Sequence, residues 1–516
     1  MRQGKRAAPG PARLTTLDVL RESAATVTDG NGTVPVTAVC DQAARLARTL
    51  AEHGVGPDTR VGVCADRGAG MLTALLGVWW AGGAIVPLEP DSPLPRLEIR
   101  ARDTGLRLVV SDAGHAGLAG SLGGDLVVIT LGQHVAEPLD PVAAPADALA
   151  YTVFTSGPAG PAGVDITRRA LANVLAVGRR DLGLGPGDRF AAVTTAAFDI
   201  ALLELLLPLV CGASLVIAAA ADTREAGRLR SLIERNAATA LHATPHIWRL
   251  LRSGGDVPAS LRLRLCSGGR LPADLAASLT APDAVLWNFY GHTETTMWTA
   301  AGVVAPGQVP AVIGPAIDHT RVYVLDGGLA PVPVGAVGEV HIAGVGVARG
   351  YLGRDRHLPT PFRPDPWATE PGARMYATGD LGRWREDGGL ELTRVAPRNP
   401  VEATMAGIWA DLLAVTEPIG VHDNLFGLGA GSLAAVRFAA RIADIYGVYL
   451  GIHHIVAAPA IAALAEIVSA DLDSAGIAVA AGEAELAALS DEELDDLLRA
   501  LFAVRDRRRA ARGDGR

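Results

Sequence analysis

Ser432 is the side chain whose type and setting point most directly to chemistry. It follows the glycine-rich turn of GLGAGSLAAVRF and opens a segment, Ser432–Tyr446, with the apolar spacing of an amphipathic helix. A serine hydroxyl at a helix N-terminus lies near free N–H groups and the positive end of the helix dipole, which together stabilise an attached phosphate. The position therefore suits a phosphate-linked serine, and an unmodified serine that caps the helix is the alternative.

A second candidate phosphate site is the segment Phe154–Val164, which reads FTSGPAGPAGV. Thr155, Ser156 and Gly157 begin a loop of small residues between an apolar segment and a predicted helix. Such a loop can wrap a phosphate with its backbone N–H groups. Because the chain contains 60 glycines and 33 prolines, an ordinary Gly-Pro-Ala loop is the alternative.

Lysine is almost absent from the chain. Of the 46 lysines and arginines, one is a lysine, Lys5, and it lies in the basic N-terminal tail. The folded part must therefore perform its chemistry without an ammonium side chain. The formal net charge of -9 gives no reason to expect a nucleic acid as partner.

The apolar and cysteine patterns favour a cytoplasmic protein that does not enter a membrane. The four cysteines are scattered without a CxxC spacing, which fits a reducing compartment. The apolar runs Met71–Leu88 and Ala201–Ala221 are interrupted by glycine, and the second also by Glu204 and Pro208. We interpret both as a buried helix followed by a buried strand, and the N-terminus lacks the apolar core of a secretory signal.

The elements that must position these residues alternate along the first three quarters of the chain. The predicted helices are Asp41–His53, Met71–Ala81, Arg169–Gly178, Ile200–Leu209 and Arg224–Asn236. The predicted strands are Arg60–Ala65, Ala84–Pro87, Leu106–Val110, Leu126–Thr130, Arg189–Thr194, Ser214–Ile217 and Ala240–His242. Alternation of this kind predicts an α/β fold with parallel sheets and helices on both faces. From Val303 to Leu392 shorter, β-rich segments predict a small second subdomain, with hairpin signals at residues 326–328 and 387–389.

Beyond a short linker at residues 395–400 the pattern becomes all-helical. We predict helices at Val401–Ala414, Ser432–Tyr446 and Ala460–Ser469, with Met405, Ile408, Trp409 and Leu412 on one face of the first. An acidic stretch, Leu489–Phe502, predicts one more short helix, and a basic tail follows it.

Several segments in order carry a resemblance to a known family. They read WWAGGAIVPLEP, FTSGPAGPAGV, AAFDIALLELLLPLVCGASLVI, NFYGHTETTMW, GEVHIAGVGVARGYLGR and MYATGDLGRW. From about Leu14 to Leu392 the chain resembles the amino-acid adenylation domains of nonribosomal peptide synthetases, within the acyl-adenylate-forming superfamily. From Pro400 to about Ala470, where IWADLLAV and GVHDNLFGLGAGSL occur, it resembles a peptidyl or acyl carrier domain, whose serine takes a 4'-phosphopantetheine arm. The matching serine is Ser432.

The resemblance implies roles at matching positions. Glu294 would hold Mg²⁺ against the phosphates of ATP, Asp380 would accept the ribose hydroxyls, and Tyr290 would stack on adenine. Asp199 would grip the α-ammonium of an amino acid, with a helix N-cap as the alternative role. The other implied nucleotide-binding residues are Thr155, Ser156, Gly157 and Thr293. The implied pocket lining is Asp199, Ile200, Leu203, His242, Leu265, Ser267, Phe289, Met297 and Trp298. Since the last of these side chains are bulky, the lining is similar to those that accept glycine or another small amino acid.

The chain also departs from the family pattern. The phosphate loop is one residue short, Pro158 and Ala159 replace hydroxyl residues, and Ala162 stands where a lysine is expected. After MYATGDLGRWREDGGLELTRV the sequence passes directly to the carrier segment, so the mobile C-terminal subdomain and its second lysine are missing. Loss of one transition-state charge typically costs about 3–4 kcal/mol, a factor of about 10²–10³ in rate. Arg168 or Arg169 is the candidate substitute, since a guanidinium also stabilises phosphoryl charge.

The sequence thus predicts five segments: a disordered tail at 1–13, a truncated adenylation domain at 14–394, a linker at 395–400, a carrier domain at 401–470, and an acidic helix with a basic tail at 471–516. The predicted function is a carrier module in which Ser432 holds an aminoacyl or acyl thioester and the adenylation domain is impaired or serves as a scaffold. The alternative is an active ATP-dependent ligase that loads its own carrier with a small amino acid such as glycine, with or without a partner in trans. Expected partners are a phosphopantetheinyl transferase, other assembly-line enzymes including a separate adenylating enzyme, and a small amino acid.

Overall fold

The fold is described from a computed structural model. It covers residues 20–132, 136–157, 160–196, 198–307, 313–353, 360–413, 418–421, 423, 425, 428, 432–451, 454–455 and 460–472. For Ser156, Gly157 and Ser432 the backbone alone is described. The predicted tail at 1–13, the predicted helix Leu489–Phe502, and Pro158 and Ala159 lie outside the described residues.

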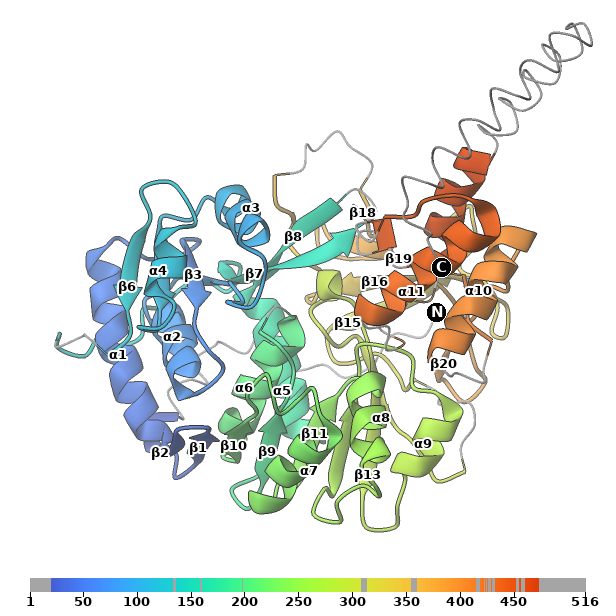
Figure 1. Ribbon diagram of the computed structural model, residues 1–516. Helices are drawn as coiled ribbons and strands as arrows, with labels where there is room; N and C mark the ends of the chain where they lie inside the picture. Colours follow the sequence, from blue (N-terminus) through green and yellow to red (C-terminus); the bar gives the residue numbers. More distant parts are fainter. Residues whose placement is uncertain are drawn as a thin grey trace, which may run out of the picture.

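A seven-stranded sheet forms the N-terminal part of the core (Figure 1). Its strands run in the order β17-β8-β7-β4-β3-β5-β6. The bounds are β3 (Arg60–Cys64), β4 (Ala84–Pro87), β5 (Leu108–Ser111), β6 (Val127–Thr130), β7 (Leu149–Gly157), β8 (Gly160–Thr167) and β17 (Gly350–Tyr351). The pairs among β3 to β7 are parallel, whereas β8 returns antiparallel to β7 as a hairpin.

An eight-stranded sheet forms the second half of the core, in the order β14-β13-β12-β11-β9-β10-β1-β2. The bounds are β1 (Thr26–Asp29), β2 (Gly32–Pro35), β9 (Arg189–Ala192), β10 (Ser214–Ile217), β11 (Ala240–Ala243), β12 (Leu263–Cys266), β13 (Val285–Tyr290) and β14 (Ala300–Val303). Its inner pairs are parallel and its edge pairs β1–β2 and β13–β14 are antiparallel. The predicted α/β fold with parallel sheets is confirmed.

The helices account for both apolar runs of the sequence. Helices α1 (Val36–Glu52), α2 (Ala69–Trp80), α5 (Arg168–Asp181) and α6 (Asp199–Val210) contribute to one apolar core shared by strands of both sheets. Every residue of α2 from Met71 onward is buried, and α6 is buried except at Ile200. No helix in the described part of the chain combines the length and apolar character needed to cross a bilayer. The outer helices are α3 (Leu94–Thr104), α4 (Ala116–Gly120), α7 (Ala226–Arg235), α8 (Pro245–Ser253) and α9 (Ala273–Leu279).

The predicted β-rich subdomain is an antiparallel five-stranded sheet. It contains β15 (Thr320–Leu325), β16 (Gly338–Gly344), β18 (Phe362–Pro364), β19 (Arg374–Trp384) and β20 (Leu390–Thr393). The predicted hairpin at 387–389 joins β19 to β20, where Asp387 accepts a hydrogen bond from the backbone of Gly389. This sheet matters for the site because β19 carries Asp380.

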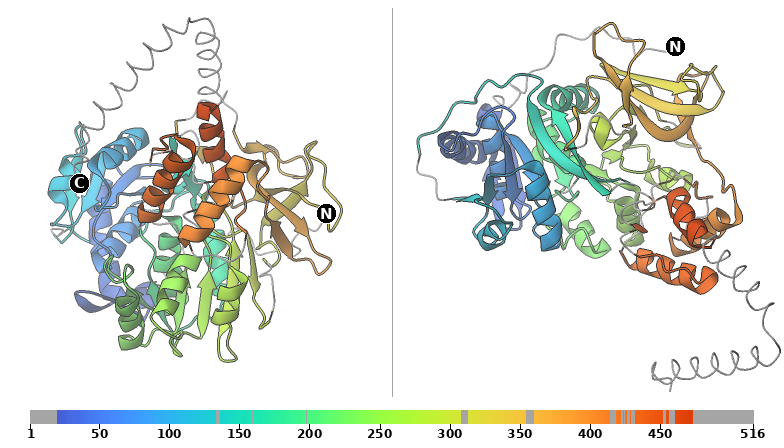
Figure 2. Two further views of the ribbon diagram at one scale, coloured as in Figure 1. Left: turned by 45° about the vertical axis from the view of Figure 1, so that its right-hand side comes forward. Right: turned by 90° about the horizontal axis from the view of Figure 1, so that it is seen from above.

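The C-terminal segment has a separate helical core, as predicted. Helices α10 (Pro400–Leu413) and α11 (Ser432–Tyr446) pack against each other and against a helix at residues 461–472. The Trp409 and Phe438 rings stack with centroids 4.5 Å apart at the centre of this bundle. Figure 2 shows the bundle as a body of its own beside the α/β core.

Candidate active site

Asp199 is the first residue of α6 and is almost fully buried. Its Oδ1 accepts the backbone N–H of Ile200 at 2.9 Å, and the Thr293 side chain also bonds to the carboxylate. Its Oδ2 is buried without a hydrogen-bond partner in the described structure. The helix N-cap is Phe198 rather than Asp199, so the alternative role as N-cap does not account for this free oxygen. A buried carboxylate oxygen that accepts no hydrogen bond needs a donor, and an ammonium group would supply one.

A second unpaired polar group belongs to Tyr151 on β7, a residue that the sequence did not single out. Its hydroxyl is fully buried with no partner among the described residues. Burial and the nearby charge of Asp199 hold the pKa of Tyr151 well above its usual value, so the hydroxyl is neutral. In the sequence this tyrosine is one aromatic residue in an apolar strand, and no local signal distinguishes it.

The implied pocket residues come together at the ends of three neighbouring strands. His242 lies on β11, Ser267 follows β12, and His242 Nε2 is 2.7 Å from Ser267 Oγ. The Phe289 ring on β13 stacks on Trp298 with centroids 3.9 Å apart and planes inclined by 14°. Leu203, Leu265 and Met297 belong to the same apolar core. Ile200 reaches this region through its Cδ1, which lies next to Gly268.

The wall is closely packed around Trp298. The His242 ring packs edge-on against Trp298, with centroids 5.6 Å apart. Burial lowers the pKa of His242 to about 3, so its imidazole is uncharged at neutral pH.

The segment after β13 is bent sharply to bring Met297 and Trp298 back onto the wall. Thr296 and Met297 have φ of 60° and 64°, in the left-handed region that non-glycine residues seldom adopt. A Cβ on Gly291 would lie 2.1 Å from the carbonyl oxygen of Met297, so only glycine permits this approach. The bend therefore depends on Gly291 and shapes the pocket.

Asp380 is the centre of a hydrogen-bonded group on the nucleotide side. Its Oδ2 accepts the Tyr290 hydroxyl at 2.7 Å and lies 2.9 Å from His292 Nε2. Burial alone would lower the pKa of His292, but the hydrogen bond and charge of Asp380, with Glu294 nearby, raise it above its usual value. His292 lies inside the YGHTE motif, yet sequence reasoning gave it no role. The raised pKa favours the charged form of the imidazole beside the implied ribose acceptor.

Glu294, the implied magnesium ligand, lies in the short 3-10 turn Thr293–Thr295 and is largely buried. Its Oε1 accepts the Tyr351 hydroxyl at 2.9 Å, a partner that the sequence did not suggest. The Thr293 side chain bonds to Asp199, and its role toward the nucleotide stays a prediction. The turn thus links the two halves of the site, and the role of Glu294 toward a metal stays a prediction.

The prediction of an open phosphate loop is wrong. Thr155, Ser156 and Gly157 are the last residues of β7, and they pair with Ala162, Pro161 and Gly160 of β8. The shortened segment closes as a hairpin because two strands joined by a very short connection pair directly. Part of its backbone N–H groups are therefore committed to the strand ladder instead of a phosphate.

The proposed substitution of lysine by Arg168 or Arg169 is also wrong. Arg168 is buried and donates to the carbonyl oxygens of Trp79 and Gly83 at 3.2 and 2.8 Å. Arg169 bonds to Asp147 at 2.9 Å. Both arginines follow β8, and the six residue steps from Ala162 to Arg168 span about 20 Å when they are extended as a strand. Neither guanidinium reaches the hairpin end.

Ser432 is the first residue of α11, as the sequence predicted. Its side chain and the preceding residues 429–431 lie outside the described part of the chain. The helix N-terminus is thus in the place that a phosphate-linked serine requires, and the modification itself stays a prediction.

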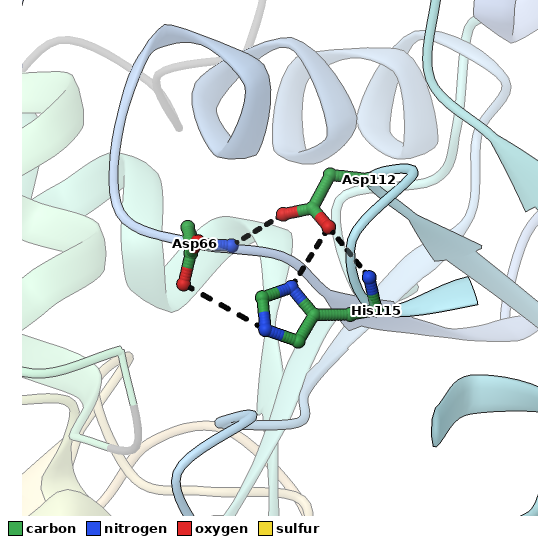
Figure 3. A group of neighbouring side chains, drawn as sticks. All are labelled: Asp66, Asp112 and His115. Atoms are coloured by element: carbon green, nitrogen blue, oxygen red, sulfur yellow. Dashed lines mark hydrogen bonds and ion pairs between the residues drawn. The ribbon is translucent and has the colours of Figure 1, made fainter. Parts of the chain in front are cut away.

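One further cluster, Asp66, Asp112 and His115, has metal-ligating side chains within 4.8 Å of one another (Figure 3). Asp112 Oδ1 accepts the His115 backbone N–H at 2.9 Å and lies 2.8 Å from His115 Nδ1, while Oδ2 accepts the Asp66 N–H at 2.8 Å. These bonds close the turns that follow β3 and β5. The Asp112 carboxylate is fully engaged in that structural role.

Comparison with family models gives two matches in chain order. Residues 21–352 match the model described as AMP-binding enzyme. Residues 403–468 match the model described as phosphopantetheine attachment site.

Among curated proteins, the chain is 41% identical over 366 residues to a dimodular nonribosomal peptide synthase of Bacillus subtilis, covering 68% of this chain and 15% of that protein. It is 29% identical to tyrocidine synthase 3 of Brevibacillus parabrevis, covering 83% of this chain and 8% of that protein. The second alignment spans 549 positions, more than the 516 residues of this chain, so the relative has a substantial stretch with no counterpart here. The chain spans less than a third of these relatives' length.

Solved structures of similar proteins agree with these matches. The nonribosomal peptide synthetase FmoA3 superposes with a TM-score of 0.69 at 28% identity, covering 89% of this chain and 51% of that one. A four-domain nonribosomal peptide synthetase bound to AMP and glycine superposes with a TM-score of 0.66 at 25% identity, covering 88% and 42%.

The buried carboxyl of Asp199 should make the stability of the fold depend on pH. Burial raises the pKa of this carboxyl to about 6 from its ordinary 3.8, so the folded state holds the proton more tightly than the unfolded state. Stability from this group is present below the ordinary pKa and is lost as pH rises through the folded value. Replacement by asparagine should therefore raise the free energy of unfolding near neutral pH by about 1–3 kcal/mol and have little effect below about pH 4.

Denaturant unfolding of Asp199→Asn and wild type at both pH values measures this difference. Asp91→Asn is the matched control, because Asp91 is exposed and pairs with exposed Arg224. A stabilisation by Asp199→Asn that is equal at both pH values would contradict the assignment.

Proposed function

The chain belongs to the AMP-binding enzyme family and joins that domain to a phosphopantetheine attachment domain, and from this premise we propose that it is a carrier module with an impaired adenylation body. It has the adenylation–carrier architecture of nonribosomal peptide synthetases. In the proposal, Ser432 carries a 4'-phosphopantetheine arm that holds an aminoacyl or acyl thioester. The adenylation body binds a small amino acid and contributes little adenylation of its own.

The absence of lysine from residues 6–516 is the observation that most directly supports impaired adenylation. Adenylation brings a substrate carboxylate against the α-phosphate of ATP, so two negative groups must approach each other. Their charge is usually offset by preorganised cations, each worth about 10²–10³ in rate. Here Ala162 occupies the position of the first lysine, and Arg168 and Arg169 are engaged elsewhere.

The residues on the nucleotide side fit the sugar and base of ATP better than its phosphates. AMP-binding enzymes use ATP and Mg²⁺, and here Tyr290 and Asp380 would hold the adenosine while Glu294 would hold the metal ion, since a carboxylate is a hard oxygen ligand. The raised pKa of His292 favours its charged form next to Asp380. In the proposal, the carboxylates of Asp380 and Glu294 and the absence of lysine from residues 6–516 leave the charge of the triphosphate poorly offset.

The pocket supports glycine as the preferred amino acid. The free Oδ2 of Asp199 would accept the ammonium, and the stacked Phe289 and Trp298 rings occupy the space of a side chain. The solved synthetase bound to AMP and glycine shows that a relative of similar fold takes this ligand. Other small amino acids are the next candidates.

The arm on Ser432 requires a phosphopantetheinyl transferase, and the module requires other assembly-line enzymes to supply and remove its cargo. Because the body lacks the adenylating cations, a separate adenylating enzyme is the proposed source of the acyl group. The alternative is an active ligase completed in trans by a partner that provides the missing lid and its lysine. The proposed domain boundaries are 14–394 and 401–470, joined by the linker 395–400.

Glycine should bind to the purified chain more tightly than any amino acid with a large side chain. The physical reason is steric, because in the proposed pocket a large side chain would meet the stacked rings of Phe289 and Trp298. Isothermal calorimetry with glycine, alanine and phenylalanine measures the order, and Trp298→Ala should admit the larger ligands. A preference of the wild-type chain for phenylalanine would contradict the pocket assignment.

Treatment with a phosphopantetheinyl transferase and coenzyme A should add one arm per chain, at Ser432. Intact mass measures the addition, and Ser432→Ala should abolish it. Ser469→Ala, a change of the same kind in the helix 461–472 of the same domain, should leave it unaffected. An arm that persists in Ser432→Ala would contradict the carrier assignment.

Restoring an ammonium should raise adenylation. Ala162→Lys is expected to increase ATP–pyrophosphate exchange with glycine by about tenfold or more, whereas Ala162→Met, of similar length and without charge, should not. Because Ala162 is buried, circular dichroism of both variants serves to confirm folding. Wild-type exchange that already equals that of the lysine variant would contradict the impairment.

A further inference from the structure

Helix α3 lies beside strand β8 of the hairpin formed by β7 and β8 (Figure 1). Leu97 and Ala101 of this helix belong to a buried apolar cluster, and Phe154 of β7 packs at the edge of the same cluster. Arg100 is buried on α3 between them, with 5% of its surface exposed. A charged side chain is therefore buried beside an apolar cluster.

The guanidinium of Arg100 lies on an aromatic ring and lacks an anionic partner. Its Cζ is 5.6 Å from the centroid of the Phe154 ring, and it forms no hydrogen bond or ion pair with a residue that the structure describes. Glu89, which follows β4, accepts the Thr195 hydroxyl instead. Burial lowers the pKa of Arg100 to about 10, so the side chain stays charged at neutral pH. Contact with an aromatic face offsets only part of the cost of burying an unpaired charge.

A second arginine without a described partner lies one turn earlier on α3. Arg96 is exposed and likewise makes no hydrogen bond or ion pair within the described part of the chain. Residues four apart lie on one side of a helix, and like charges so placed repel each other. Arg102 differs from both, because its Nη2 is 3.0 Å from Asp103 Oδ1. An anion between Arg96 and Arg100 would relieve the repulsion and neutralise the buried charge.

Arg100 lies on one face of the hairpin, and the position of the expected lysine lies on the other. Phe154 pairs with Gly163, and Thr155 pairs with Ala162. Successive side chains of a strand point to opposite faces, and paired residues share a face. Because the Phe154 ring points toward Arg100, Ala162 points away from it. Arg100 therefore does not replace the missing lysine, and its anion would occupy a separate site.

We propose that Arg100 and Arg96 form an oxyanion site on the α3 face of the hairpin that binds a phosphate group. A guanidinium presents parallel N–H donors that match two oxygens of one phosphate. Two sources share this chemistry, namely the phosphate end of a bound nucleotide and free phosphate or pyrophosphate. The inference does not depend on the proposed carrier function.

Calorimetric titration of the full chain with inorganic pyrophosphate tests this site. Arg100→Met removes the charge and keeps an unbranched side chain, and it should lower the affinity about tenfold or more, as expected for the loss of charge-assisted hydrogen bonds. Arg102→Met is the matched control, because Arg102 lies on the same helix and pairs with Asp103. The control should bind pyrophosphate within about twofold of wild type.

Thermal unfolding of the same variants separates binding from folding. Because an unpaired buried charge is unfavourable, Arg100→Met should be at least as stable as wild type without pyrophosphate and should gain less from its addition. Arg96→Met, at an exposed position, should lower the affinity about two- to fivefold. Affinities that are unchanged in both variants, or no binding of pyrophosphate to wild type, would overturn the site.

Titrations with ATP and AMP distinguish the two sources of phosphate. If the phosphate end of a nucleotide occupies the site, Arg100→Met should weaken ATP and leave AMP unchanged. If the site takes free phosphate, Arg100→Met should weaken pyrophosphate and leave both nucleotides unchanged. The mass gain at Ser432 is measured on the same samples, so a failure of the carrier function would be seen independently of the phosphate result.

Discussion

Joining a carboxylate to the α-phosphate of ATP requires that two negative groups approach each other. Residues 6–516 contain no lysine that could offset their charge. The α/β body retains the two sheets, the bent segment after β13 and the β-rich sheet that carries Asp380. What it lacks is an ammonium at the hairpin between β7 and β8. In the proposed function, such a body holds a substrate and contributes little to activating it.

The proposed amino-acid pocket is unfavourable for stability. Asp199 and Tyr151 bury polar atoms that have no partner among the described residues, and such groups destabilise a fold unless a ligand satisfies them. Thr296 and Met297 add strained backbone at the same place. Buried unpaired groups and strain gathered in one pocket indicate a site shaped for binding. The carrier bundle, in contrast, is held by an apolar core around Trp409 and Phe438.

Local sequence patterns predicted the elements well and the contacts poorly. Helix α11 was expected from Ser432 to Tyr446 and spans those residues, because a glycine-rich turn before an amphipathic segment is a local signal. The segment around Thr155 was expected to be an open loop. Its pairing with Ala162 depends on the short connection between the strands, which the residue types do not reveal. Arg168 was misassigned because its partners, the carbonyls of Trp79 and Gly83, are distant in sequence. The contact of His292 with Asp380 joins residues distant in sequence and likewise carries no local signal.

In the proposed function, the isolated chain holds an amino acid but does not activate it. A single-turnover reaction with the protein in excess over ATP, in the presence of glycine and Mg²⁺, tests this without dependence on product release. Rapid quench and detection of glycyl-adenylate should show a small fraction of the ATP converted, although glycine binds under the same conditions. Conversion of nearly all of the ATP to adenylate within the time of a normal catalytic turnover would contradict the account.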